Sequence, residues 1–199
     1  MANARNTVRI IGGKWRGRKL TFGSFDDLRP TADRGRETLF SWLDAHLPGS
    51  HCLDLFAGSG SLGFEALSRG AASVTMIDVR RAVVVQLNEQ AALLTAAPLI
   101  IRADARSWLK RAQTSASRYD IVFLDPPFAV NLLDEVLPLV CTLATAGAMI
   151  YVEQPQHGPR ASIPNGWAEA RTTHSGAAAL SLLVRGQSTP DAKDAAPSP

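Results

Sequence analysis

The sequence predicts an α/β fold in which helices cover a mostly parallel β-sheet. Strand-like and helix-like segments alternate from about residue 51 to residue 153, which is the pattern of successive βαβ units. A glycine-rich turn over residues 58–63 follows the first strand of this series. An acidic residue stands at or just after the end of four strands, namely Asp54, Asp78, Asp104 and Asp125. Ligands of open α/β sheets bind at the carboxyl ends of the strands, so we expect the functional site there.

The segment before this alternating series predicts a β-hairpin followed by a helix. Residues 8–22 contain two strand-like pieces on either side of Gly12-Gly13, a dipeptide typical of hairpins. Asp33 is a suitable N-cap for a helix over residues 34–46, which has apolar residues on one face and Pro48 beyond its end. We therefore expect residues 1–33 to form an N-terminal hairpin arm ahead of the main domain.

The main domain is expected to span residues 34–185. Its strands are predicted over residues 52–56, 73–78, 99–101, 119–124 and 149–153, and its further helices over residues 62–68, up to 94, 105–112 and 132–143. Residues 167–174 and 177–184 predict a terminal antiparallel pair, which makes a seven-stranded, mostly parallel sheet whose last strand is antiparallel. Residues 186–199 are rich in Pro, Ala, Ser and Asp, which predicts a disordered tail.

Composition indicates a cytoplasmic protein without a membrane segment or a metal. The longest apolar run, residues 139–152, is too short and too interrupted to span a bilayer, and no signal peptide is recognisable. Cys52 and Cys141 both lie in apolar patterns and are expected to be reduced core residues. The four histidines are scattered, with no second ligand at metal-binding spacing.

Positive charge is concentrated near the N-terminus. Residues 1–36 hold nine basic and three acidic residues, a net charge of +6, whereas the whole chain carries +3. This distribution favours a polyanion that binds at one end of the molecule, and basic residues interleaved with Trp15 favour nucleic acid. A solvated hairpin whose Trp15 packs on the body is the alternative. The candidate contacts to RNA are Arg9, Lys14, Trp15, Arg16, Arg18, Arg29 and Arg34.

The glycine-rich turn and the acids predict a nucleoside-type cofactor. Gly58, Gly60 and Gly63 fit the spacing of a dinucleotide-binding turn, but Asp54 would repel a pyrophosphate and attract a ligand with an ammonium group. Asp78 can accept both hydroxyls of a ribose. Asp104 can accept from an adenine amine, cap the following helix, or do both. The candidate cofactor-binding residues are Asp54, Phe56, Ala57, Gly58, Gly60, Asp78, Asp104, Ala105 and Asp125.

The sequence Asp125-Pro126-Pro127-Phe128 predicts a rigid ledge at the end of the strand over residues 119–124. The two prolines fix two φ angles and remove two backbone donors, so a carboxylate, a carbonyl oxygen and an aromatic face are presented together. Such a ledge suits a flat ring that bears an exocyclic amine. We expect Asp125, Pro126 and Phe128 to be the catalytic residues. A plain strand-to-helix turn with a buried Phe128 is the structural alternative.

Over about residues 8–185 the chain resembles the bacterial small-subunit ribosomal RNA guanine-N2 methyltransferases of the RsmD type. The block from Arg9 to Arg18 and the stretches Leu28-Arg29-Pro30-Thr31 and Arg36-Glu37-Thr38-Leu39-Phe40 carry the most specific part of this resemblance. The glycine-rich turn and the Asp125 ledge add to it, although class I methyltransferases in general share the glycine loop.

The resemblance implies a Rossmann-like class I methyltransferase fold with S-adenosylmethionine as cofactor. It implies methylation of the N2 amine of a guanine in 16S rRNA, within the small ribosomal subunit or its late assembly intermediate, by a monomer. Two other functions remain open from the residues themselves. One is an N-methyltransferase that acts on an amine or amide of DNA or protein, and the other is a non-catalytic RNA-binding module that retains a nucleoside pocket.

Overall fold

The computed structural model describes residues 5–23, 33–127 and 132–186. The N-terminal hairpin consists of β1 (Arg5–Arg9), the 3₁₀ turn η1 (Gly13–Trp15) and β2 (Lys19–Gly23). The remaining elements are, in order, α1 (Asp33–Leu43), η2 (Asp44–His46), β3 (His51–Asp54), α2 (Ser61–Ser68), β4 (Ser73–Asp78), α3 (Arg81–Leu94), β5 (Leu99–Arg102), α4 (Ala105–Ala112), β6 (Tyr119–Leu124), α5 (Leu132–Leu143), β7 (Ala144–Pro155), β8 (Trp167–Ser175) and β9 (Ala178–Arg185).

The central sheet has seven strands in the order β5-β4-β3-β6-β7-β9-β8. Strands β3 to β7 are parallel to one another, and β9 runs antiparallel to both of its neighbours, β7 and β8. The predicted seven-stranded sheet with an antiparallel last strand is therefore confirmed. The strand order reverses between β3 and β6, so a crevice forms beside the carboxyl ends of these two strands.

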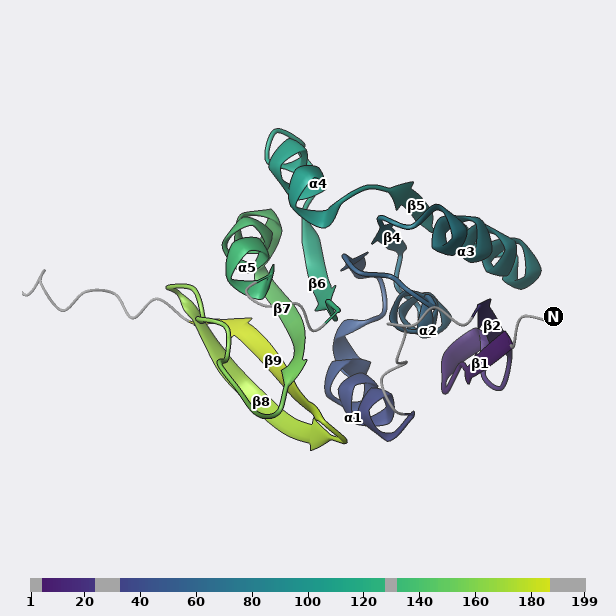
Figure 1. The fold of residues 1–199 in the computed structure, drawn as a ribbon, viewed down its shortest axis with the longest axis horizontal. Helices are drawn as coiled ribbons and strands as arrows, with labels where there is room; N and C mark the ends of the chain where they lie inside the picture. Colours follow the sequence, from purple (N-terminus) through teal and green to yellow (C-terminus); the bar gives the residue numbers. More distant parts are fainter. Residues whose placement is uncertain (1–4, 24–32, 128–131, 187–199) are drawn as a thin grey trace, which may run out of the picture.

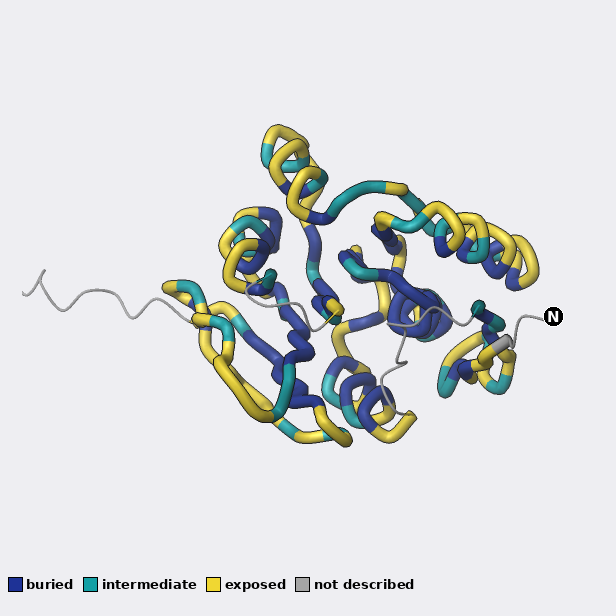
Figure 2. Tube along the Cα trace, viewed as in Figure 1, coloured by how far each residue is buried: buried dark blue, intermediate teal, exposed yellow. Residues whose placement is uncertain are grey.

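Helices cover both faces of the sheet, as Figure 1 shows. Helices α4 and α5 lie on one face, where Leu53, Ile77 and Val122 belong to the apolar cluster beneath them. Helices α1, α2 and α3 lie on the other face, over a second cluster that includes Phe40 and Phe64. In Figure 2 the strands between the layers are dark blue while the outer helix faces are exposed, because each strand of a parallel sheet is buried on both sides.

The hairpin shares its core with the helices beside it. Val8, Ile10, Leu20 and Phe22 are buried in the same apolar cluster as α1, α2 and α3. The prediction that Gly12-Gly13 alone forms the turn is wrong, because residues 10–18 connect the strands and include the 3₁₀ turn η1. The glycines serve close packing instead: a Cβ on Gly13 would lie 1.8 Å from the carbonyl oxygen of Ser68 in α2.

Helix α1 differs from its prediction at both ends. The α-helix ends at Leu43 and tightens into the 3₁₀ turn η2 before Pro48. Asp33 belongs to the first turn, where its carboxylate accepts a hydrogen bond of 2.6 Å from the Arg36 guanidinium. Arg36 is fully buried and also donates to the Arg9 carbonyl oxygen at 2.9 Å, so it joins α1 to the hairpin.

Candidate active site

A cavity of about 330 Å³ opens at the carboxyl edge of the sheet. This volume lies within the range of roughly 300–1,000 Å³ that is usual for small-molecule sites. The cavity is lined by Asp54, Leu55, Phe56, Ala57, Gly58, Ser59, Ser61, Leu62, Asp78, Val79, Arg80, Ala103, Asp104, Ala105, Arg106, Asp125, Pro126, Pro127 and Leu132. All four acids at the strand ends therefore face one space.

The three glycines of the turn have different roles. Gly58 lines the cavity, whereas Gly60 and Gly63 are outside its lining. Gly60 has a φ of +77°, and a Cβ there would come within 2.7 Å of the Leu87 and Phe64 side chains. A Cβ on Gly63 would come within 2.4 Å of Met76. Gly60 and Gly63 thus let α2 pack tightly against the sheet and α3, which positions the turn rather than touching a ligand.

Asp54 is a buried carboxylate at the end of β3. It is 2 % exposed, and its Oδ2 accepts a hydrogen bond of 3.0 Å from the Gly63 amide. Burial raises the pKa of Asp54 to about 7, and the nearby Asp78 carboxylate adds to this, while the Gly63 and Phe56 amides oppose it. A cationic ligand group would reverse the effect, because it stabilises the ionised form.

Asp78 ends β4 and is held in place by its surroundings. Its carboxylate accepts from the Gly58 amide at 3.1 Å and from the Arg80 amide at 2.9 Å. The Arg80 guanidinium contacts both carboxylate oxygens at 3.2 Å. The acid proposed for ribose hydroxyls thus lies against a guanidinium and against the glycine turn.

Asp104 caps helix α4, as one of its two predicted roles requires. Its Oδ1 accepts from the Ser107 amide at 3.0 Å, and this hydrogen bond lowers the pKa of its carboxyl. Its side chain also lines the cavity, together with the buried Ala105. The prediction of a helix cap is confirmed, and the contact to an adenine amine stays a prediction.

The ledge after β6 borders the same cavity. Asp125, Pro126 and Pro127 line it, with Asp125 half-buried and Pro126 buried. Phe128, the third predicted catalytic residue, lies outside the described residues. The described part of the ledge therefore brings a carboxylate and a proline carbonyl to the space that the other acids share.

Several residues of the cavity were not among the predicted site residues. Val79 is 57 % exposed although it is apolar, and it lines the cavity directly after Asp78. Leu132 and Arg80 also contribute to the wall. An exposed valine that follows a strand-end acid offers a flat apolar surface for a ring, and its position in the sequence was a usable signal. The contribution of Leu132, from α5, depends on the tertiary fold.

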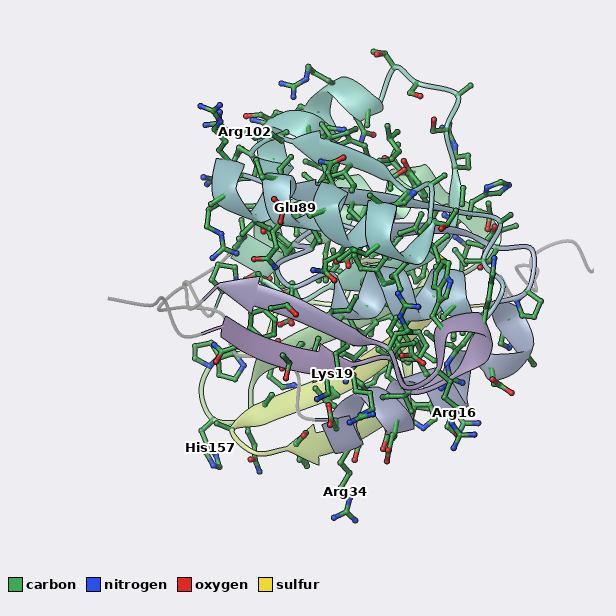
Figure 3. The ribbon with its side chains drawn as sticks, turned by 90° about the vertical axis from the view of Figure 1, so that its right-hand side faces the viewer. Arg16, Lys19, Arg34, Glu89, Arg102 and His157 are labelled. Carbon is green, nitrogen blue, oxygen red and sulfur yellow. The ribbon has the colours of Figure 1, made fainter. Side chains whose placement is uncertain are left out.

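The predicted RNA-contacting residues lie on the hairpin and at the start of α1, except Arg29, which falls outside the described residues. Figure 3 shows Arg16 and Arg34 pointing away from the ribbon, and both are exposed. Arg18 is exposed but donates to the Leu93 carbonyl oxygen at 3.0 Å, at the end of α3. Arg9 likewise donates to the Gly17 carbonyl oxygen at 3.3 Å.

Trp15 is only partly available at the surface. Its ring packs against the apolar cluster of α1, α2 and α3, and the Lys14 ammonium lies 5.6 Å from the ring centroid. The side chain thus has the packing role given above as the alternative, and its uncovered part lies beside two basic residues, Lys14 and Arg16.

Within the described residues, no group of three or more His, Cys, Asp or Glu side chains is arranged to hold a metal ion. The helices of the same part of the chain are all too short or too polar to cross a membrane.

The strand order, the single antiparallel strand and the acid-lined cavity define a Rossmann-like class I methyltransferase. The family model described as "Conserved hypothetical protein 95" matches residues 8–184. The chain belongs to this family.

Two relatives and one solved structure illustrate the similarity. The chain is 44% identical over 170 residues to "Ribosomal RNA small subunit methyltransferase D" of Haemophilus influenzae, covering 83% of this chain and 87% of the relative. It is 43% identical over 181 residues to the protein of that name in Escherichia coli, covering 89% and 90%. The solved structure of Escherichia coli yhhF superimposes with a TM-score of 0.80 at 42% identity, covering 91% of this chain and 99% of yhhF.

Proposed function

We propose that this protein uses S-adenosylmethionine to methylate the exocyclic N2 amine of a guanine in 16S rRNA. The substrate is the small ribosomal subunit or its late assembly intermediate. The observation that carries the proposal is the convergence of Asp54, Asp78, Asp104 and Asp125 on one cavity beside the Pro126 carbonyl. The names of the two relatives support an rRNA substrate.

The residues of the cavity fit S-adenosylmethionine chemically. Asp54 would hold the ammonium group and Asp78 the ribose hydroxyls, with Asp104 and the backbone around Ala105 near the adenine. Val79 and Phe56 supply apolar wall for the ring. Phe56, Ala57 and Gly58 form the part of the turn that a ligand can approach closely.

S-adenosylmethionine, when bound, supplies a methyl group that is already a strong electrophile. The chain must hold a poor nucleophile, the conjugated amine of guanine, in line with it. We assign to the Asp125 carboxylate and the Pro126 carbonyl oxygen the acceptance of the two amine hydrogens. This orients the nitrogen lone pair, and good orientation is worth roughly 7–11 kcal/mol. The amine loses its proton after the new bond forms, so Asp125 need not deprotonate it first. Phe128 is assigned to stack on the extruded base.

The direct test is transfer of a labelled methyl group from S-adenosylmethionine to purified small subunits that lack the modification. Digestion of the RNA and mass spectrometry of its nucleosides should then find one N2-methylguanosine. Naked 16S rRNA and DNA are run beside the subunits. Label in DNA or in a ribosomal protein, or methylation at another guanine atom, would contradict the proposed substrate.

Cofactor binding should depend on pH through Asp54. Because its pKa is about 7 in the folded protein, the carboxyl is mostly neutral at pH 6, and binding of an ammonium group must ionise it. We expect the affinity for S-adenosylhomocysteine to fall about tenfold from pH 8 to pH 6, with release of a proton. Calorimetry in buffers of different ionisation enthalpy measures both quantities.

Asp54→Asn is the matched variant for this measurement, and it should bind more weakly with a flat pH profile. Among the described residues that line the cavity there is no histidine to titrate in this range. In the absence of ligand the raised pKa has the opposite sign for stability. The neutral carboxyl favours the folded state at low pH, and this contribution is lost as pH rises from 3.8 to about 7. An equally steep affinity profile in Asp54→Asn would remove Asp54 from this role.

Charge reversal at the hairpin should weaken RNA binding in a salt-dependent way. Arg16 is exposed and points outward, so Arg16→Glu is expected to remove about one phosphate contact. The slope of log affinity against log salt should decrease by roughly 0.7–0.9. Arg171→Glu, an equal charge change on the exposed part of β8, is the control. Filter binding from 50 to 300 mM salt, a range of about one decade in affinity per few contacts, measures both variants. Equal slopes in the two variants would exclude the hairpin as an RNA contact.

A further inference from the structure

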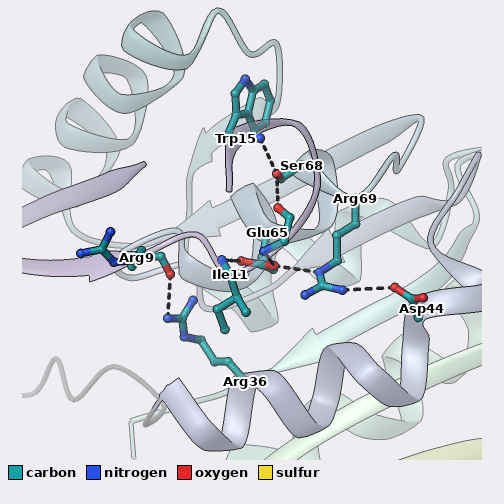
Figure 4. A network of polar contacts seen from close by, with 9 residues as sticks. Arg9, Ile11, Trp15, Arg36, Asp44, Glu65, Ser68 and Arg69 are labelled. Carbon is teal, nitrogen blue, oxygen red and sulfur yellow. Dashed lines mark hydrogen bonds and ion pairs between the residues drawn. The ribbon is translucent and has the colours of Figure 1, made fainter. Parts of the chain in front are cut away.

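The tip of the hairpin, residues 11–16, is held by a buried carboxylate of α2. Glu65 is fully buried, and its Oε2 accepts from the Ile11 amide at 2.7 Å. Its Oε1 accepts from the Gly12 amide at 2.8 Å and from the Arg69 guanidinium at 2.7 Å. Figure 4 shows this network, which continues from Arg69 to Asp44. Charge-assisted hydrogen bonds of this kind are stronger than neutral ones.

Ser68 adds a second attachment one turn further along α2. Its hydroxyl accepts from the Trp15 amide at 2.9 Å and donates to the Gly12 carbonyl oxygen at 2.6 Å. A Cβ on Gly12 would come within 2.5 Å of the Arg69 guanidinium. The tip therefore lies directly on the helix, and Glu65 and Ser68, here called the α2 clamp, bind its backbone and not its side chains.

The strands of the hairpin have attachments of their own. The Gly23 amide donates to Gln86 at 2.9 Å, and the Gln90 amide group donates to the Thr21 carbonyl oxygen at 3.3 Å, both on α3. The buried apolar residues of β1 and β2 also hold the strands. The α2 clamp is thus not required to attach the hairpin; its contacts determine where the tip lies.

The helix that carries the clamp also carries the glycine-rich turn. Helix α2 begins at Ser61, which lines the cavity, and Glu65 follows one turn later, a rise of about 6 Å. A short straight helix transmits position faithfully between its two ends. The tip of the hairpin therefore has a defined location relative to the cavity.

We propose that Glu65 and Ser68 are positioning residues that hold the hairpin tip in its RNA-binding geometry relative to the cavity. The inference rests on the proposed function. Lys14 and Arg16 project from the clamped tip, so their charges are presented before RNA arrives. A tip ordered in advance loses less conformational entropy on binding, and affinity rises accordingly. The clamp acts on recognition of RNA and leaves the methyl-transfer step unchanged.

Glu65→Gln and Ser68→Ala test the proposal, with Glu89→Gln as the charge-matched control on the exposed face of α3. A glutamine replaces one acceptor with a donor, which must face an amide N–H or Arg69. We expect faster hydrogen exchange at the amides of Ile11, Gly12 and Trp15 in Glu65→Gln. The KM for small subunits should rise about three- to tenfold, the effect of one or two lost hydrogen bonds. The value of kcat and the affinity for S-adenosylhomocysteine should stay at the wild-type level.

The outcomes separate this inference from the proposed function. Faster exchange at the tip with an unchanged KM would overturn the inference while leaving the methyltransferase assignment intact. A lower kcat with an unchanged KM would also overturn it. Wild-type protein that methylates no RNA would remove the proposed function, and this inference with it. Should Glu65→Gln not fold, Ser68→Ala decides alone, because it keeps the Glu65–Arg69 ion pair and loses only the bonds to Gly12 and Trp15.

Discussion

Replacement of Asp125 with alanine is expected to lower kcat for methyl transfer by about 10²- to 10³-fold, a loss comparable to removing one preorganised hydrogen-bonding group from an active site. The carboxylate is assigned to orient the guanine amine, so its loss leaves the nucleophile free to rotate. Affinity for S-adenosylhomocysteine should change by less than about threefold, since Asp54, Asp78 and Asp104 remain. Single-turnover assays with saturating small subunits separate the chemical step from binding.

Asp125→Asn is the matched variant for this experiment. Asparagine keeps one carbonyl oxygen that can accept an amine hydrogen, so its activity should lie between those of wild type and Asp125→Ala. If Asp125 were a general base, the asparagine variant would be as inactive as the alanine variant. Wild-type turnover in Asp125→Ala would show that the carboxylate has no part in the reaction.

Replacement of Gly13 with alanine is expected to reduce the free energy of unfolding by about 2–4 kcal/mol. The residue has a φ of +73°, a left-handed conformation that costs about 1–2 kcal/mol for a residue with a Cβ. The new Cβ would also lie 1.8 Å from the Ser68 carbonyl oxygen, and relief of that overlap costs about another 1–3 kcal/mol. Urea denaturation measures the loss, and hydrogen exchange at the Trp15 amide should report release of the tip from α2.

Gly17→Ala separates the two causes. Gly17 lies in the same hairpin and has a φ of +85°, but a Cβ on this residue would meet no other side chain or backbone atom within 4 Å. Its replacement should therefore cost only the conformational term, about 1–2 kcal/mol. Equal losses of stability in the two variants would mean that the close approach of Gly13 to α2 contributes nothing.

The order of the strands and helices could be predicted from local patterns. The strand Ser73–Asp78, the helix Ala105–Ala112 and the helix Leu132–Leu143 have the predicted bounds, because their apolar runs end at capping or turn residues. Strand β7 is longer than predicted and begins at Ala144, where pairing with Tyr119 of β6 extends it. Pairing between strands supplies hydrogen bonds that no local pattern records.

The sequence also indicated the acids of the site but not their environments. Asp54 and Asp78 could be placed at one edge of the sheet because parallel strands align their carboxyl ends. The burial that raises the pKa of Asp54, and the Arg80 guanidinium that lies against Asp78, arise from packing between elements. Gly60 and Gly63 were grouped with the ligand turn on spacing alone, whereas their neighbours in space assign them to helix packing.

The sequence by itself determined the class of fold, the edge of the sheet that carries the site, and the basic character of the hairpin. These depend on periodicity, strand ends and charge, all of which are local properties of a chain. Only the tertiary structure decided that Gly12, Gly13, Glu65 and Ser68 meet, and that the hairpin tip is attached to the helix of the glycine-rich turn. These residues are more than fifty positions apart in the chain, so no local pattern can predict their contact, which exists only once the sheet and its helices are packed.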